Sequence, residues 1–559
     1  MVSSDYDGCV VEGGAMRRRA FLKGGLLAGG AAAIGLPTAS PEGFVPAHNW
    51  GGYDFGLGPA VADRLNQGPF PQYPPDAVIP GDDVVMTTTP SDEVVPNYGK
   101  GLMTYITADK GTEEIVGPDG RPVEGAWAEQ LSGRGAAAVE RAIEELVAFP
   151  LGEKLYVRPT WREVQPRKGK LELPPYLQQV FALAKSSGKR VAFRVQMVAP
   201  DYTHGPALPD FVLNTVPFVP LVLTDQSDAK EARRYLDNPW SKAMPRFDLP
   251  VFQDAFRGLV EALATEFDGH PDVEFMDTFL YGFWGEGHTW PFANNPFPDY
   301  ATAERTWVRM LETQMSAFRR TPLVTNTQPD FSRVGNSEVL DRSVRAAEWM
   351  RSDTIFIENE QIEALSNRPA WAAAVLEQGI PAGAPVARDE EGVAPAENMI
   401  EHVMDVGVSY WSLWNFHGIG AWNLRRYQEA YPEAFGRIAR RVGYRVRPSF
   451  VWSYSDGARC GLIVGLANDG IAGVPGVLRL AVEREDGTVL AEGGLDAGYP
   501  VPGKIRQAQL VLPAGTKWEG LRLKAAVEVK GVRVPVRWAC REKLEGDGSL
   551  RLRGNLRRG

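Results

Sequence analysis

One stretch of the sequence carries the residue types that acid–base chemistry needs. Residues 281–290 read YGFWGEGHTW, which places Glu286 between two glycines and close to Trp284, His288 and Trp290. Apolar ring faces raise the pKa of a carboxyl group by removing it from water, which suits a general acid. Indole faces also stack on the C–H faces of sugar rings. The alternative is a structural carboxylate that accepts hydrogen bonds from nearby backbone N–H groups. We expect Glu286 to be catalytic.

The elements that must position Glu286 follow an alternating pattern. An apolar, β-branched run predicts a strand from about Val273 to Phe283, ending just before Glu286. Runs of the same kind begin at residue 101 and at 154–161, 190–199, 321–328, 353–360, 380–388 and 408–418. Segments with helical periodicity separate them, including RPAWAAAVLEQG at 368–379. Eight such units predict an α/β fold, a closed (β/α)8 TIM barrel. An open doubly wound sheet is the alternative, but it would normally carry a glycine-rich phosphate turn.

In such a barrel the site forms where the strands end. The predicted strand ends carry carboxylates, amides, guanidiniums and indoles, which together fit a polyhydroxylated ligand. The candidates for substrate binding are Arg158, Trp161, Arg194, Gln196, Trp284, His288, Trp290, Asn326, Trp414, Asn415 and His417. The two arginines could instead brace the barrel as buried ion-pair partners. The six histidines show no metal-ligand spacing, so we expect neither a metal nor another cofactor.

The order of these features resembles the retaining glycoside hydrolases with (β/α)8 barrels, particularly β-galactosidase-like and uncharacterised bacterial glycosidase-like barrels with a C-terminal β-sandwich. The resemblance rests on YVRPTWREVQPRKG, YGFWGEGH and SYWSLWNFHG. It implies that Glu286 is the acid/base of the fourth strand. Two departures stand out: Gly285 replaces an expected Asn, and Ala384-Pro385 stands where the seventh strand would end in the nucleophile.

The second carboxylate is therefore open, among Glu358 or Glu360 after the sixth predicted strand and Asp389 or Glu390 after the seventh. We favour Glu358, because it follows its strand at once. Glycoside hydrolysis needs two carboxylates, about 5–5.5 Å apart for retention and about 6.5–9.5 Å apart for inversion. The leading hypothesis is an exported glycoside hydrolase acting on an oligo- or polysaccharide. A non-catalytic carbohydrate-binding barrel of the cell envelope is the alternative, and a structural envelope protein is a third.

The chain ends and bulk composition indicate location and partners. Residues 16–23 read MRRRAFLK and precede a Gly/Ala-rich apolar run, which resembles a twin-arginine signal with Arg18 and Arg19 as the pair. We expect export of the folded protein by the twin-arginine machinery to a bacterial periplasm or beyond. The apolar run is too short to span a membrane stably. A net charge of -10 argues against nucleic acid as a partner.

Four segments are predicted along the chain. They are an export signal with an upstream extension at 1–40, an irregular wrapping segment at 41–95, the barrel at 96–446 and an immunoglobulin-like β-sandwich at 447–559. The sandwich follows from short apolar runs separated by turns such as EDGT. Its Cys460 and Cys540 either form a disulfide, as an oxidising compartment allows, or stay as two buried thiols.

Overall fold

The computed structural model of the protein contains a closed barrel of eight parallel strands. It describes residues 83–106, 115–116, 122–123, 143–200, 205–222, 238–287, 296–326, 336–352, 365–377, 395–412, 428–455 and 459–554. Around the barrel the strands follow chain order and β13 pairs with β2 to close it, as Tyr410 opposite Gly101 shows. The strands are β2 (Gly101–Ile106), β5 (Lys154–Val157), β6 (Arg190–Phe193), β9 (Val273–Asp277), β10 (Leu323–Asn326), β11 (Trp349–Ser352), β12 (Ala374–Leu376) and β13 (Tyr410–Ser412). The predicted (β/α)8 barrel is confirmed, and the open sheet is excluded.

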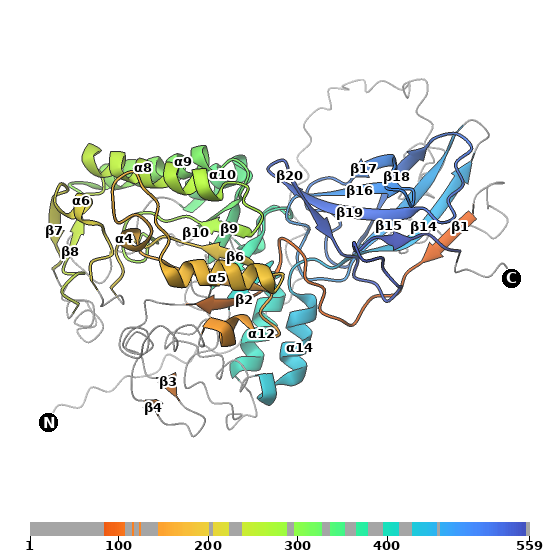
Figure 1. The fold of residues 1–559 in the computed structure, drawn as a ribbon, viewed down its shortest axis with the longest axis horizontal. Coiled ribbons are helices and arrows are strands. Elements are labelled where there is room, and N and C mark those ends of the chain that lie inside the picture. The colour runs from red at the N-terminus through yellow and green to blue at the C-terminus, as the bar shows by residue number, and fades with distance from the viewer. Residues whose placement is uncertain are drawn as a thin grey trace, which may run out of the picture.

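Helices cover the outside of the barrel (Figure 1). The longer ones are α5 (Pro175–Ser186), α8 (Pro250–Phe267), α9 (Tyr300–Ala317), α10 (Asn336–Arg345), α12 (Pro395–Val406) and α14 (Pro432–Arg441). A proline at the first position, whose missing N–H has no partner to lose, begins several of them. In α8, Phe252, Phe256 and Leu259 are fully buried at a spacing that puts them on one face, so the helix packs on the barrel through that face.

Shorter elements lie near the ends of the barrel strands. They are α4 (Trp161–Val164), α6 (Asp210–Leu213), the hairpin β7 (Phe218–Pro220) and β8 (Ala243–Pro245), and the two-residue strands β3 (Ile115–Val116) and β4 (Pro122–Val123). Figure 1 shows α6 and the β7–β8 hairpin at the end of the barrel away from the second domain.

The sixth and seventh barrel strands are not where the sequence predicted them. They are β11 and β12, and the predicted ranges 353–360 and 380–388 lie outside the described residues. The helix predicted at 368–379 is wrong, because β12 occupies its middle. Alanine and leucine have high helix propensity, but propensity is a weak local preference that tertiary contacts can override. A strand of three residues is also too short for its alternating pattern to be recognised. This shift moves the expected strand ends, and with them the expected site.

The C-terminal domain is a β-sandwich of two antiparallel sheets, as predicted. One sheet has the order β1 (Asp83–Thr87), β14 (Val446–Ser455), β15 (Cys460–Asn468), β18 (Ile505–Leu512). The other has the order β17 (Val489–Gly494), β16 (Val477–Glu483), β19 (Arg522–Val529), β20 (Val532–Val536), with β21 (Leu550–Arg551) paired to β19. The strand β1 comes from the segment that was expected to be irregular, so the sandwich contains residues from both sides of the barrel in the sequence.

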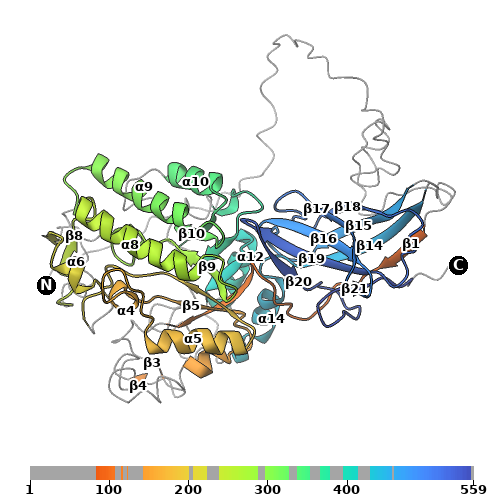
Figure 2. The same cartoon turned by 45° about the horizontal axis from the view of Figure 1, so that its top comes forward.

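The sandwich packs against the amino-terminal end of the barrel, so the carboxyl ends of the strands face away from it (Figures 1 and 2). Lys530, in the β19–β20 turn, donates to the carbonyl of Phe318 at 2.6 Å and pairs with Glu348 at 2.5 Å. Glu348 directly precedes β11, and burial raises the pKa of its carboxyl group to about 7 in spite of the Lys530 charge. The domain contact therefore contains a buried ion pair.

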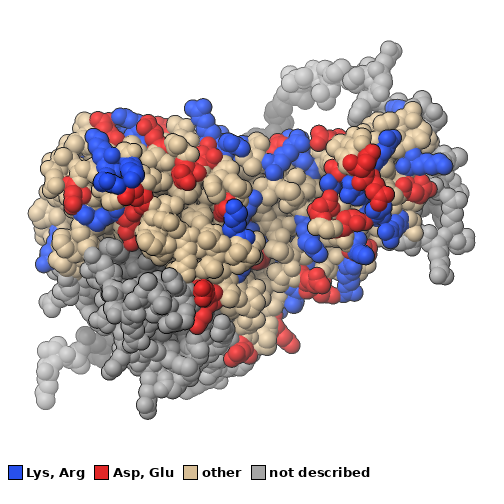
Figure 3. All heavy atoms as spheres, viewed as in Figure 1, with Lys and Arg blue, Asp and Glu red and all other residues tan. Residues whose placement is uncertain are grey.

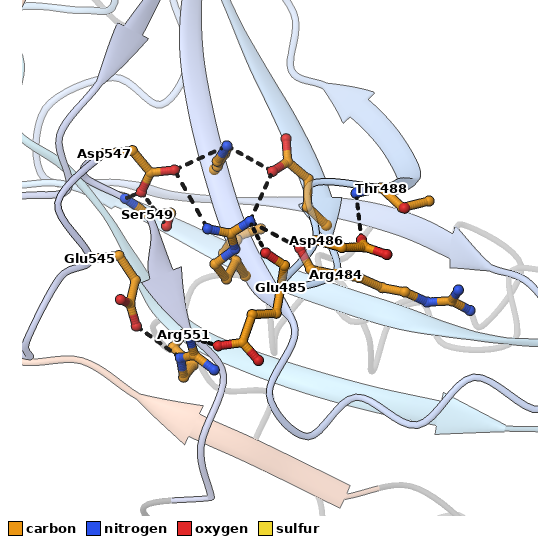
Figure 4. A network of polar contacts seen from close by, with 12 residues as sticks. Arg484, Glu485, Asp486, Thr488, Glu545, Asp547, Ser549 and Arg551 are labelled. Carbon is orange, nitrogen blue, oxygen red and sulfur yellow. Dashed lines mark hydrogen bonds and ion pairs between the residues drawn. The ribbon is translucent and has the colours of Figure 1, made fainter.

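The surface of the sandwich carries many ion pairs. Figure 4 shows Arg551 between Glu485 and Glu545, at 3.0 and 2.8 Å, with Asp547 close by. On the face in Figure 3, acidic and basic side chains are interspersed over both domains rather than gathered into patches of one sign. Within the described residues no helix is long and apolar enough to cross a bilayer.

The two sandwich cysteines do not form a disulfide. Cys460 and Cys540 are both buried free thiols. Burial raises the pKa of the Cys540 thiol to about 12, so it stays protonated at neutral pH. Of the two alternatives left open by the sequence, the structure has the pair of buried thiols.

Candidate functional site

Glu286 lies on a tightly folded turn after β9, and the turn fixes its position. Gly285 has a φ of +82°, and a side chain there would meet the Cα atom of Phe279 at 3.2 Å, so glycine is required. Trp284 has a φ of +54°, which is uncommon for a residue other than glycine, and its N–H donates to the carbonyl of Val198 at 2.7 Å. Glu286 itself is only 4% exposed. The turn therefore places this buried carboxylate at the barrel mouth.

Two guanidinium groups contact the same oxygen of Glu286. Arg194 Nη2 lies 2.5 Å from Glu286 Oε1, and Arg351 Nη2 lies 2.8 Å from it. Charged groups from β11 and from the segment after β6 therefore reach the carboxylate, while Trp290, one of its expected indole neighbours, lies outside the described residues. Burial, the largest single influence, lowers the pKa of Arg194, but the electrostatic interactions with Glu286, Tyr156 and Asp277 together outweigh it and the net pKa is raised. These contacts stabilise the ionised carboxylate.

A second carboxylate stands at the end of the seventh barrel strand. Glu377 directly follows β12, is 3% exposed, and its backbone N–H donates to the carbonyl of Ser352 at 3.0 Å. Its side chain accepts a short hydrogen bond from Arg351 Nη1 and lies 3.8 Å from Arg158 Nη1. The guanidinium of Arg351 thus contacts Glu377 through one terminal nitrogen and Glu286 through the other. One guanidinium group therefore bridges the two carboxylates.

Beneath these groups, Asp277 at the end of β9 anchors the arginines. Its Oδ2 accepts a hydrogen bond from the Tyr156 hydroxyl at 2.6 Å and lies 3.0 Å from Arg351 Nε and 3.4 Å from Arg194 Nη1. Burial is the main reason that the pKa of Tyr156 is raised well above its ordinary value, and the Asp277 charge adds to it. The phenol therefore stays protonated and donates, and both guanidiniums are fixed from below.

Several residues predicted from the strand ends do converge here. Arg158 and Arg194 are ion-paired, as the bracing alternative held, but their partners include the two candidate catalytic carboxylates. The Arg158 guanidinium also lies over the Tyr105 ring at 4.9 Å. Gln196 is fully buried, and within the described part of the chain neither polar atom of its side-chain amide has a hydrogen-bond partner. Asn326, the last residue of β10, is 3% exposed.

Trp161 has a different place from the one expected. It begins α4, is fully buried, and its indole N–H donates to Gln165 at 2.9 Å. Its ring packs edge-on against Phe211 and Phe252. A fully buried ring has no surface open to a ligand, so we do not assign Trp161 to sugar stacking.

The remaining predicted site residues lie outside the described part of the chain. They are His288, Trp290, Glu358, Trp414, Asn415 and His417, together with the other carboxylate candidates Glu360, Asp389 and Glu390. Sequence reasoning missed Arg351 and Glu377, because the strands that carry them were placed too late in the chain. The available signal was a short apolar run followed by a charged residue, WMR in one case and AVLE in the other.

The chemistry of this site is that of paired carboxylates. Two buried carboxyl groups at the carboxyl ends of the fourth and seventh strands can act together on one bond, one as acid and the other as nucleophile or base. Within the residues that the structure describes, no group of three or more His, Cys, Asp or Glu side chains is arranged to hold a metal ion.

Comparisons with known proteins give likenesses of fold. No protein-family model matches the chain, and no curated protein matches it. A GH5_18 structure from Bifidobacterium longum subsp. infantis is 12% identical, with a TM-score of 0.36, over 61% of this chain and 78% of that one. A family 39 glycoside hydrolase from Bacteroides cellulosilyticus WH2 is 12% identical, with a TM-score of 0.34, over 76% and 82%. Endo-glycoceramidase II from Rhodococcus sp. is 14% identical, with a TM-score of 0.33, over 77% and 100%.

Proposed function

We propose that this protein is a glycoside hydrolase that cleaves an oligo- or polysaccharide with Glu286 and Glu377 as its two catalytic carboxylates. The observation that carries the proposal is the guanidinium of Arg351, which contacts both carboxylates at the mouth of a (β/α)8 barrel. Because both side chains are almost fully buried, their pairing places two acidic groups beside one small volume. Two carboxylates in that relation are what glycosidic bond cleavage requires.

Glu286 is the general acid/base in this proposal. It protonates the leaving glycosidic oxygen, and, where Glu377 has formed a covalent intermediate, it then activates the water that completes the reaction. Glu377 replaces Glu358 as the preferred second carboxylate, and it attacks the anomeric carbon or activates water directly. The charges of Arg158 and Arg351 keep Glu377 ionised, as either role demands.

Other buried polar groups would hold the sugar hydroxyls. Gln196 and Asn326 bring amide donors and acceptors to the strand ends, and Arg158 and Arg194 bring guanidiniums. Trp284 is the described indole nearest in sequence to the acid/base, and it is the candidate for ring stacking. The case for a non-catalytic binding protein rested on a displaced acid after the seventh strand. It loses that support, because Glu377 follows this strand directly.

Hydrolysis of a panel of aryl glycosides and polysaccharides tests the proposal. The wild type is compared with Glu286→Gln and Glu377→Gln, and we expect turnover that each substitution abolishes. Glu358→Gln serves as the variant that should keep activity. The anomeric configuration of the product, read by proton NMR, assigns Glu377 as nucleophile if it is retained and as general base if it is inverted. Sugar binding without turnover in the wild type would support the carbohydrate-binding alternative instead.

Export by the twin-arginine route is a separate part of the proposal, supported by the motif at residues 16–23. In a bacterial host, we expect the wild type to reach the periplasm with a shortened N-terminus. A double Arg18→Lys, Arg19→Lys variant should stay in the cytoplasm at full length. Equal periplasmic amounts of both proteins would refute this route.

A further inference from the structure

Among the residues that the structure describes, the barrel mouth holds equal numbers of buried positive and negative groups. The positive groups are Arg158, Arg194 and Arg351, and the negative groups are Asp277, Glu286 and Glu377. Each is at most 5% exposed, and ion pairs join them into one network. With all six groups ionised, the network is neutral. Neutrality matters here, because an uncompensated charge in a buried site is costly.

The proposed chemistry disturbs this balance. A general acid must carry a proton when the glycosidic bond breaks. Glu286 receives two guanidiniums on one oxygen, an arrangement that favours the ionised carboxylate. Protonating Glu286 would leave the six groups with a net charge of +1 and would weaken both of its ion pairs. A neutral sugar offers nothing that compensates this charge.

An anionic sugar would compensate it. Resting on the hydrolase function proposed above, we propose that the substrate carries a carboxylate or sulfate group on the sugar beside the scissile bond, and that Arg194 and Gln196 bind this group. A guanidinium binds a carboxylate through two parallel N–H donors, so Arg194 is suited to exchange Glu286 for the substrate anion. The ligand charge of -1 then offsets the +1 that appears when Glu286 takes up a proton.

The position of Gln196 supports this assignment. It lies two residues after Arg194 on a segment that still pairs with the neighbouring strand, since Gln196 forms a parallel bridge with Thr160. Residues two apart in an extended segment point to the same side, so the amide of Gln196 and the guanidinium of Arg194 face the same region. A fully buried amide without a hydrogen-bond partner in the described chain is costly unless a ligand satisfies it.

The resulting step balances in atoms and charge. The substrate anion binds Arg194, and Glu286, released from that ion pair, takes one proton from solvent. Glu286 then gives this proton to the glycosidic oxygen as the bond from that oxygen to the anomeric carbon breaks. Glu377, or a water that it deprotonates, forms the new bond to the anomeric carbon. In the first case, a water activated by Glu286 later releases the sugar and restores both carboxyl groups.

The test compares matched substrates that differ only in charge. They are the 4-nitrophenyl β-glucuronide and β-glucoside, and the β-galacturonide and β-galactoside, with the 6-sulfated galactoside to separate sulfate from carboxylate. A charge-assisted hydrogen bond contributes about 1.5–3 kcal/mol, so we expect kcat/KM for the better anion to exceed that for its neutral counterpart by roughly 10- to 100-fold. Arg194→Met should collapse this ratio toward one, and Arg194→Lys should keep part of it.

A matched control comes from the same strand. Arg190 begins β6 at the opposite end of the barrel, where its guanidinium lies over Tyr98 at 4.9 Å. Arg190→Met should leave the ratio of anionic to neutral turnover unchanged, even if it lowers stability. A merely structural role for Arg194 would change both substrates equally and would leave the ratio intact.

The possible outcomes separate this inference from the hydrolase proposal. Turnover of neutral glycosides at rates equal to or above those of the charged ones would overturn the anionic substrate and leave the hydrolase standing. No turnover of any substrate would count against the hydrolase, and calorimetry would then compare acidic with neutral oligosaccharides. Preferential binding of the acidic ones that Arg194→Met abolishes would support anion recognition. Equal or absent binding would overturn it.

Discussion

The substitution Glu377→Gln separates catalysis from structure most sharply. The change keeps the size of the side chain and removes its charge, leaving Arg351 and Arg158 without one of their buried anions. Breaking a buried ion pair costs about 3–5 kcal/mol, against a total stability of roughly 5–15 kcal/mol. We therefore expect a folded protein whose melting temperature falls by about 6–20 °C, since 1 kcal/mol shifts it by roughly 2–4 °C in large domains.

The catalytic loss should be far larger than such destabilisation can produce. Positioned proton transfer alone contributes about 10²–10⁴-fold, so kcat should fall by at least 10²-fold at 25 °C, where the variant is still folded. Glu274→Gln is the matched control. Glu274 is also fully buried, pairs with Lys154 at 3.3 Å, and lies on β9 at the opposite end of the barrel from the mouth. It should lose comparable stability with unchanged kcat.

Calorimetry and steady-state kinetics on the best substrate of the panel measure both effects. Equal losses of activity in the two variants, each in proportion to its loss of stability, would refute a catalytic role for Glu377. Restored turnover of Glu377→Gly by azide, with release of a glycosyl azide, would identify the side chain as a nucleophile rather than a base.

Three further predictions concern other parts of the molecule. Glu348 has its pKa raised from 4.5 to about 7, so it favours the folded state below about pH 4.5 and loses that contribution as the pH rises through 7. Between pH 5 and pH 8, the free energy of unfolding should therefore fall less in Glu348→Gln than in the wild type, by up to about 3 kcal/mol. Melting temperatures measured across this range check it, and the same dependence on pH in both proteins would contradict it. Cys460 and Cys540 should resist a thiol reagent at pH 8 until denaturant is added, and then both should react without prior reduction. Gly285→Ala should lower kcat with folding retained, because the new methyl group would press on Phe279 and shift the turn.

The barrel could be predicted from the sequence because most of its strands are apolar runs that differ clearly from the helical segments between them. VEFMD and GLMTYI are continuous buried runs, and the helices between them show clear periodicity. The strands β11 and β12 have four and three residues, and AWAAAVLEQG has the composition of a helix. Tertiary pairing in the closed barrel, rather than local preference, decides their structure.

The same limit applies to the candidate site. Glu286, Arg158 and Arg194 were found because their strands were placed correctly. Glu377 and Arg351 were missed because an error of a few residues in strand placement changes which side chain stands at the mouth. The surroundings of Glu286 also could not be read from its neighbours in sequence. Arg351, which contacts it, lies 65 residues later in the chain. Arg194, the other contact, belongs to the preceding strand–helix unit.

Because β1 pairs with β14, the barrel is an insertion in the sequence between two neighbouring strands of the sandwich. Asp83 lies opposite Ser453, so two strands that neighbour each other in space enclose the whole barrel in the sequence. No single cut of the chain separates the domains cleanly, and a shortened protein that begins at the barrel would leave β14 as an uncovered sheet edge. Exposed edges of this kind recruit strands from other molecules. The strand β1 therefore covers the exposed edge of β14, a strand far from it in the sequence, and protects that edge against aggregation.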